Sequence, residues 1–139
     1  MTEHKSFRSL ISERQHEAEA ALVRGDVGPR LRMWSHNDPV ALFAAVGPSK
    51  TGWDELEPTF RSVAARLSGG RDVTYEIMAF DVSADMAWTA GFARFKVSID
   101  GRPLSQYTLR ITHVYRREGG EWKVVHEHSN WEHPDPASR

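Results

Sequence analysis

The second half of the chain contains four successive runs of strand-type residues, and this pattern limits the fold more than any other feature of the sequence. The runs cover residues 72–82, 86–98, 104–117 and 121–131. Short stretches of turn-forming residues separate them, at Ser83-Ala84-Asp85, Asp100-Gly101 and Gly119-Gly120. Strands joined by such short turns pair with their chain neighbours, so the pattern predicts an antiparallel meander.

The first half of the chain is mainly helical. Apolar residues at spacings of three, four and seven predict one long amphipathic helix that ends near Gly25, and they are Phe7, Leu10, Ile11, Ala18, Ala21 and Leu22. Gly28-Pro29 suits the start of a second, short helix. Helical spacing returns at residues 53–67, where Thr51 is the expected capping residue and residues 68–70 end the helix. Residues 40–46 have the length and apolar character of a strand.

Helices followed by strands predict an α+β fold, in which the helices must cover one face of the sheet. A strongly curved antiparallel sheet packed against three N-terminal helices forms a cone, and the open end of a cone is a natural ligand pocket. Residues 1–132 are expected to form this single domain. Residues 133–139 are polar and interrupted by proline, so a frayed C-terminal tail is expected there.

The composition excludes several classes of function. Lys and Arg together number 18 against 19 Asp and Glu, so no strong field attracts nucleic acid or an anionic membrane. No apolar run has the length of a bilayer-spanning helix or the features of a signal peptide, so a cytoplasmic location is expected. The chain has no Cys, which leaves His, carboxylates, hydroxyl groups and Arg for any chemistry.

The most distinctive segment is LRITHVYRREGGEWKVVHEHS at residues 109–129. Together with MWSHNDPVALF at 33–43 and GWDELEPTF at 52–60, it resembles the nuclear transport factor 2-like superfamily, in its SnoaL-like and ketosteroid isomerase-like branch. The resemblance covers nearly the whole chain. It implies a cone with an interior pocket and a homodimer formed by packing the outer faces of the sheets.

The resemblance does not imply one reaction, because this fold serves isomerases, cyclases, dehydratases, epoxide hydrolases and non-catalytic modules. The ketosteroid isomerases use a Tyr on the first helix, and the first helix here contains none. The limonene epoxide hydrolases use Arg and Asp two positions apart on a strand, whereas Arg110 is followed at that spacing by Thr112. The acidic catalyst that SnoaL-type cyclases carry near their last strand is not evident in HEHSN at 126–130.

Three of the seven histidines lie in KVVHEHSNWEH, residues 123–133. Alternation along a strand places four residues on one face, namely Trp122, Val124, His126 and His128. If Val114 lies opposite Val124, then Thr112 lies beside His126 and Arg110 beside His128. A register shifted by one residue pairs Tyr115 with Val124 and places His113 beside His126 instead.

A polar group of this kind could transfer protons if it faces the pocket. In that hypothesis His128 or His126 is the acid or base, Arg110 stabilises an anion, and Asp38 orients the substrate. The expected substrate-binding residues are Trp34, His36, Tyr75, Trp88 and Thr112. The alternative for His126 and His128 is a position in the packed interior or at an exposed dimer face.

Two further alternatives concern Asp38 and metal binding. Asn37, Asp38 and Pro39 are residue types that favour turns, so Asp38 could simply accept hydrogen bonds from nearby backbone amides. His126 and His128 could share a zinc ion if Asp38, His36 or Glu76 supplied a third ligand. Because the closely spaced ligand motifs of zinc enzymes, such as H-E-x-x-H on a helix, are absent, no metal and no cofactor are expected.

Two functions remain open. In the first, the protein binds a small organic molecule in the pocket and, as an enzyme, performs cofactor-free proton transfer of the isomerase, cyclase or dehydratase type. In the second, it is a non-catalytic ligand-binding or assembly module, and the dimer face matters more than the pocket.

Overall fold

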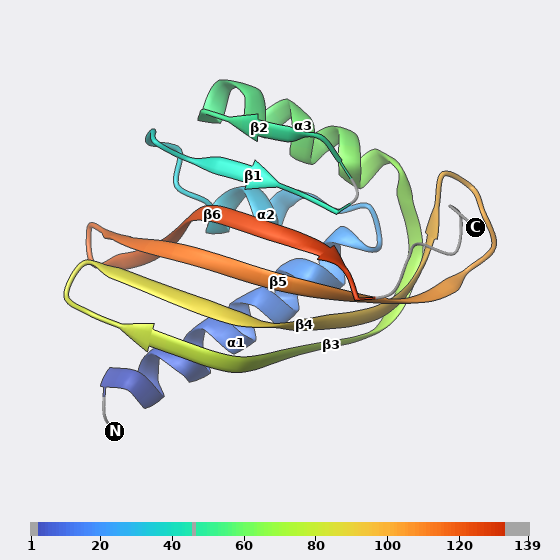
Figure 1. The fold of residues 1–139 in the computed structure, drawn as a ribbon. Coiled ribbons are helices and arrows are strands. Elements are labelled where there is room, and N and C mark those ends of the chain that lie inside the picture. The colour runs from blue at the N-terminus through green and yellow to red at the C-terminus, as the bar shows by residue number, and fades with distance from the viewer. Residues whose placement is uncertain (1–2, 46, 133–139) are drawn as a thin grey trace.

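The computed structural model describes residues 3–45 and 47–132, which form an α+β fold of three helices packed on a six-stranded, mostly antiparallel sheet (Figure 1). The helices are α1 (Glu3–Leu22), α2 (Gly28–Met33) and α3 (Trp53–Ala65). The strands are β1 (Ala41–Phe43), β2 (Ser49–Thr51), β3 (Leu67–Val82), β4 (Met86–Ile99), β5 (Ser105–Glu118) and β6 (Glu121–Trp131). The polar tail expected at 133–139 lies outside the described residues.

The predicted meander is confirmed. The strand order is β2-β1-β6-β5-β4-β3, and the four long strands β3 to β6 pair with their chain neighbours in antiparallel fashion. The short strand β1 joins the sheet in parallel with β6 and in antiparallel with β2. The limits of β4, β5 and β6 lie within one residue of the predicted runs.

The junction between α3 and β3 differs from the prediction. The helix ends at Ala65, and β3 begins at Leu67, five residues before the expected start. Residues 68–70 were expected only to stop the helix. Instead they belong to the strand, where the register with β4 shifts twice between Ser68 and Thr74 and lets the strand bend.

The start of α3 also differs. The capping bond expected from Thr51 is absent, because Gly52 occupies the N-cap position. The backbone N–H of Trp53 donates instead to Oδ1 of Asp38, at 2.8 Å. A carboxylate suits this place, since the first N–H groups of a helix are unpaired and carry partial positive charge.

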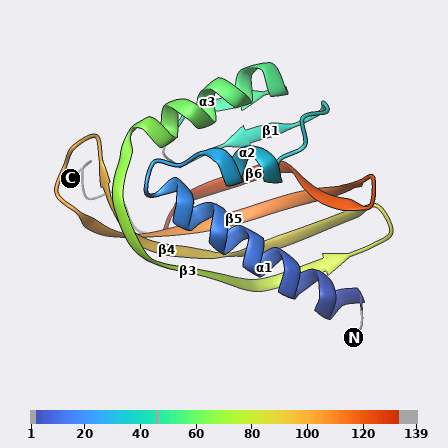
Figure 2. The ribbon, with the colours of Figure 1, turned by 180° about the vertical axis from the view of Figure 1, so that it is seen from behind.

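The helices cover the inner face of the curved sheet. Figure 2 shows α1 crossing this face with α2 beside it, while α3 lies over the end formed by β1 and β2. One row of α1 residues spaced four apart points inward, and it consists of Phe7, Ile11, Gln15 and Glu19. Leu10, which was expected on this stripe, is 39% exposed. No helix in the described part of the chain has the length and apolar character needed to cross a membrane.

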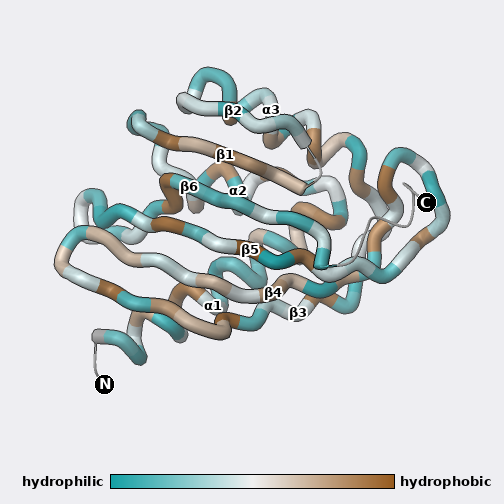
Figure 3. The backbone as a smooth tube through the Cα atoms, in the orientation of Figure 1, coloured by the Kyte–Doolittle hydropathy of each residue, from teal (hydrophilic) through white to brown (hydrophobic). Residues whose placement is uncertain are grey.

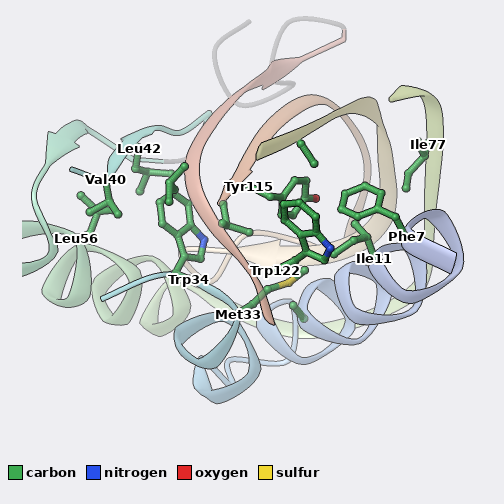
Figure 4. Close-up of a cluster of buried hydrophobic side chains, with 14 of the residues drawn as sticks. Phe7, Ile11, Met33, Trp34, Val40, Leu42, Leu56, Ile77, Tyr115 and Trp122 are labelled. Carbon is green, nitrogen blue, oxygen red and sulfur yellow. The ribbon is translucent and has the colours of Figure 1, made fainter. Parts of the chain in front are cut away.

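Two apolar clusters fill the inside of the sheet. The first lies toward the β5–β6 turn and is drawn in Figure 4, where Phe7, Tyr115 and Trp122 gather between α1 and the sheet. In the same view Trp34 and Leu42 lie on the side of β6 nearer to α3. The second cluster lies toward the β4–β5 hairpin and contains Leu22, Phe95, Val97 and Leu109. The layer between these clusters is polar.

A bulge in β6 overturns both registers considered for the last hairpin. Tyr115 pairs with Val124, as in the shifted register, but Val114 pairs with His126, so Val125 is an extra residue. Val124 and Val125 are both buried, which reverses the alternation for the rest of the strand. Consequently Glu127 and Ser129 face inward, whereas His126 and His128 do not share the face of Trp122 and Val124.

Candidate functional site

Eight polar side chains from six elements form what we call the buried polar layer. They are Gln15 and Glu19 of α1, Arg30 of α2, Tyr75 of β3, Thr89 of β4, His113 of β5, and Glu127 and Ser129 of β6. All except Tyr75 are less than 9% exposed. Figure 3 shows the polarity of this part of the sheet, with a mainly hydrophilic β6 running beside a hydrophobic β1.

Arg30 joins two carboxyl groups. Its Nη2 donates to Oε1 of Glu19, and its Nη1 donates to Oε1 of Glu127 at 3.1 Å. Its Nε is fully buried and has no hydrogen-bond partner among the described residues. The guanidinium therefore holds the two acids near each other, but its own hydrogen bonding is incomplete.

His113 connects the acids to the hydroxyl groups. Its Nε2 lies 2.8 Å from Oε1 of Glu127, and its Nδ1 lies 3.1 Å from the Tyr75 hydroxyl and 3.2 Å from Nε2 of Gln15. A proton on Nε2 satisfies this arrangement, because Glu127 can only accept while Tyr75 and Gln15 can both donate. Gln15 also donates to the Tyr115 hydroxyl at 2.9 Å, which extends the network into the first apolar cluster.

The two carboxyl groups have pKa values displaced in opposite directions. Burial is the largest influence on Glu19 and raises the pKa of that carboxyl, although the Arg30 charge opposes it. Burial acts in the same direction on Glu127, but Arg30, His113 and Ser129 outweigh it and lower the pKa of Glu127 to about 2. Paired acids whose environments separate their pKa values are suited to acid and base roles.

An interior cavity of about 50 Å³ lies against this layer. Its walls are mostly apolar and come from both clusters, with Leu22 of the second cluster and Leu42 and Phe60 of the first among them. Its polar lining consists of Glu19, Arg30, Glu127 and Ser129. By the usual allowance of about 10–15 Å³ per water, the cavity holds roughly four water-sized groups. An engineered cavity of about 150 Å³ in another protein holds benzene, so this one accepts only a smaller molecule or one part of a larger molecule.

Five of the nine predicted site residues lie on the outer face of the sheet, away from the cavity. Arg110, Thr112 and His128 line a shallow outer groove of about 360 Å³, and Trp88 is 42% exposed. His126 is half-buried, and its Nδ1 lies 3.0 Å from the carbonyl oxygen of Ala41. Thus the structure brings Arg110, Thr112 and His128 together as expected, but on the opposite face from the one that the hypothesis required.

Of the other four predicted residues, Trp34 and His36 line a common surface cavity of about 590 Å³, and His36 and Asp38 both contact Trp53. Asp38 accepts a hydrogen bond from the backbone N–H of Trp53, which fits a structural role at a turn. His36 stacks on the Trp53 ring and contacts the carbonyl oxygen of Leu31. Trp34 is 2% exposed and belongs to the first apolar cluster. Tyr75 is the one predicted residue that takes part in the buried polar layer.

The His and carboxylate side chains of the described residues do not form a metal site. Within residues 3–45 and 47–132, no three His, Asp or Glu side chains converge where they could hold a metal ion.

Comparison with known families complements this geometry. Residues 16–130 match the model of a family described as the SnoaL-like domain. The chain belongs to this family. Its fold is that of the nuclear transport factor 2-like superfamily, as the resemblance of its sequence implied.

Solved structures with the same fold differ widely in their suggested roles. A nuclear transport factor 2-like superfamily protein from Salmonella enterica aligns with 98% of this SnoaL-like chain and 99% of its own, at 13% identity and a TM-score of 0.72. A protein from Streptomyces avermitilis, proposed to be a dehydratase, aligns with 91% of this chain and 97% of its own, at 18% identity and a TM-score of 0.71. A domain from Thiobacillus denitrificans, proposed to be a calcium/calmodulin-dependent protein kinase type II association domain, covers 86% and 93% of the two chains, at 18% identity and a TM-score of 0.68. At these identities the likeness shows the fold alone.

A curated relative matches over a shorter length. F-box protein SKIP8 from Arabidopsis thaliana is 26% identical over 99 residues, which are 71% of this SnoaL-like chain. The chain spans 39% of the length of that relative.

The sequence contained a signal for the residues that the histidine hypothesis missed. In this SnoaL-like domain, Gln15 and Glu19 continue the inward row of Phe7 and Ile11 at intervals of four, so two polar residues interrupt an apolar stripe. Polar residues on a buried stripe require partners. The partner of Glu19 is Arg30 of α2, and Gln15 contacts His113 and Tyr115 of β5. Glu127 was the hardest to assign, because its direction depends on the bulge at Val125.

Proposed function

We propose that this SnoaL-like protein binds a small organic molecule, or the small head of a larger one, in the interior cavity. The observation that carries the proposal is an apolar cavity with a charged, hydrogen-bonded wall formed by Glu19, Arg30 and Glu127. Ligand sites generally combine mostly apolar walls with a few well-placed polar groups. The small volume means that specificity comes from the group that enters the cavity.

Cofactor-free proton transfer is the reaction that this cavity supports best. Glu19 and Glu127 flank the same guanidinium, and their pKa values are displaced in opposite directions. A carboxyl group that retains its proton can act as an acid, while a neighbouring carboxylate can act as a base. This assignment replaces the outer-face histidines as the proposed catalytic groups.

Methyl NMR spectroscopy tests whether the cavity binds ligands. Small organic molecules added to the protein should shift the methyl signals of Leu22, Val23 and Leu42, which line the cavity. Ala45 also lines it, so Ala45→Phe should fill the space and abolish the shifts. Ala84→Phe is the matched control, because Ala84 is exposed in the β3–β4 turn. Shifts that persist in Ala45→Phe would contradict the proposal.

The outer face of the sheet supports a second candidate function, assembly into a homodimer. Several large apolar side chains are exposed there, namely Phe43, Met78, Met86 and Trp88, with exposed fractions of 40–61%. Exposed apolar groups gathered on one face are typical of protein interfaces. The similarity in fold to a proposed kinase association domain agrees with such a role.

Light scattering coupled to size-exclusion chromatography tests this assembly. The unmodified protein is expected to elute as a dimer, and Trp88→Lys is expected to shift it to the monomer. Leu104→Lys is the control, since Leu104 is 40% exposed but lies just before β5, in its connection to β4. A monomer at every concentration, or equal effects of the two substitutions, would remove the outer face as an interface.

A further inference from the structure

Glu19 lines the interior cavity, and one of its two carboxyl oxygens has no hydrogen-bond partner among the described residues. The residue is 2% exposed and lines the cavity, and its Oε1 is held by Arg30. Its Oε2 receives no hydrogen bond from any described residue, and it is not among the fully buried atoms. A carboxyl oxygen beside mostly apolar walls is costly unless a hydrogen-bond partner reaches it. The cavity is where such a partner can come from.

We propose that Oε2 of Glu19 forms the hydrogen bond that recognises the ligand, and that the ligand group entering the cavity is an uncharged carbonyl, amide or hydroxyl group. This inference rests on the proposed function and names the ligand class for the same cavity. Arg30 holds the Glu19 carboxyl group through Oε1, which leaves Oε2 to contact the ligand.

The charges around Glu19 argue against ionic ligands. Arg30 of α2 and Glu127 of β6 face it, His113 of β5 stands behind Glu127, and the Tyr75 hydroxyl of β3 lies beyond His113. Arg30 already faces the Glu127 carboxylate and donates to the Glu19 carboxyl, so a ligand carboxylate would lack a cation of its own. An ammonium group would bring a second cation against the Arg30 guanidinium, which also lines the cavity.

The protonation state of Glu19 makes the contact selective. In the protonated form Oε2 donates to a carbonyl oxygen, and in the ionised form it accepts from an N–H or O–H group. A ketone can only accept, so its binding requires the proton on Glu19. An amide can both donate and accept, so it binds either form. Burial raises the pKa of the Glu19 carboxyl, so the protonated form persists to higher pH than in an exposed glutamate.

Four probes with four heavy atoms each test the ligand class, since they match the size of the cavity. Acetone, acetamide, acetate and isopropylammonium would each be titrated to about 50 mM while the methyl signals of Leu22 and Val23 are followed, because ligands this small bind weakly. Acetone and acetamide are expected to bind, whereas acetate and isopropylammonium are expected to bind at least about tenfold more weakly.

Three variants test the role of Glu19. Glu19→Met should weaken acetone and acetamide by about tenfold, as expected for the loss of one hydrogen bond to a buried group, while the exposed control Glu17→Met should not. Glu19→Gln keeps an acceptor for Arg30 and offers an N–H to the cavity at every pH. Acetone binding should therefore weaken with rising pH in the unmodified protein and stay constant in Glu19→Gln.

The outcomes separate the inference from the proposed function. If the probes bind but Glu19→Met and the unmodified protein have the same affinities and pH dependence, the role of Glu19 is wrong and the cavity remains a ligand site. Preferential binding of acetate or isopropylammonium would overturn the ligand class. If no probe shifts the cavity methyl signals of the unmodified protein, both the proposed function and this inference fail. Should Glu19→Met fold poorly, the pH profile of Glu19→Gln decides the matter.

Discussion

Nε2 of His113 lies 2.8 Å from Oε1 of Glu127, and the same oxygen accepts a hydrogen bond from Arg30 at 3.1 Å. His113 is 1% exposed and Glu127 is 4% exposed. One carboxylate oxygen thus holds together β5, β6 and α2 in the interior of the domain. Buried ionic groups contribute little net stability when complete, but the loss of one member leaves the others without compensation.

Glu127→Gln is therefore expected to lower the free energy of unfolding by about 2–4 kcal/mol, because Arg30 and His113 lose their shared anion. Urea denaturation followed by circular dichroism measures the change. Glu121→Gln serves as the control, since Glu121 is exposed where it pairs with Lys123, and surface pairs of this kind contribute at most about 1 kcal/mol. Equal effects of the two substitutions would show that the buried network does not stabilise the fold.

The pH dependence of stability should show the two acids acting in opposite directions. Glu127 has a pKa of about 2 in the folded protein against an ordinary value of 4.5, so its contribution is complete above about pH 4.5 and is lost as the pH falls towards 2. Glu19 has a raised pKa, so the folded state retains a proton that the unfolded chain releases above 4.5. Its ionisation therefore lowers stability as the pH rises.

Glu19→Gln tests whether ionisation of Glu19 lowers the stability of the protein as the pH rises. The unmodified protein should lose stability relative to Glu19→Gln as the pH rises from about 4.5, because the amide has no proton to release. Urea midpoints measured between about pH 5 and pH 8 provide the comparison. Glu17→Gln, an exposed change on the same helix, should run parallel to the unmodified protein. A constant difference between Glu19→Gln and the unmodified protein across this range would rule out the raised pKa.

Substitutions at Asp38 distinguish a structural role of this residue from a catalytic one. Asp38→Ala should destabilise the protein by about 1 kcal/mol, because the N–H of Trp53 loses the acceptor that lies 2.8 Å away. Asp38→Asn keeps an acceptor oxygen at that position and should cost less. Thermal unfolding measures both changes. If Asp38→Asn is instead as stable as the unmodified protein but blocks ligand turnover, Asp38 acts in the chemistry and not only at the helix terminus.

Gly91 is required by the close approach of β3 and β4. A Cβ atom at this position would overlap the backbone carbonyl oxygen of Glu76, next to the register shift between Ile77 and Ala79. Gly91→Ala should therefore cost about 2–4 kcal/mol of unfolding free energy. Gly101→Ala provides the comparison, because Gly101 has a φ of 75° but no neighbour within 4 Å, and its cost should be about 1 kcal/mol. A smaller effect at Gly91 than at Gly101 would contradict the steric explanation.

The fold was predictable from the sequence because its main signals are local. Turn residues separated the strands, so the limits of β4, β5 and β6 were found within one residue. The errors arose where a distant partner decides the local structure. Asp38 caps α3 in place of Thr51, and the pairing of β3 with β4 draws Ser68 and the following residues into a strand.

The candidate site was less accessible to sequence reasoning. Strict alternation along the last strand placed His126 and His128 inside, and the extra residue Val125 places Glu127 there instead. A bulge leaves no reliable mark in the sequence, since Val124 and Val125 are ordinary strand residues. The carboxyl groups of Glu19 and Glu127, 108 positions apart in the chain, meet only through Arg30.

The bulge at Val125 also means that the last strand can lose one residue and keep its inward face. Trp122 and Val124 on one side of it, and Glu127 and Ser129 on the other, all face inward only because one residue between them is surplus to the alternation. Deletion of the Val125 codon would leave a regular strand in which each of these four side chains keeps its face. The pairing of β4 with β5 has no bulge, so a residue inserted there would reverse the inward and outward faces along one end of the strand.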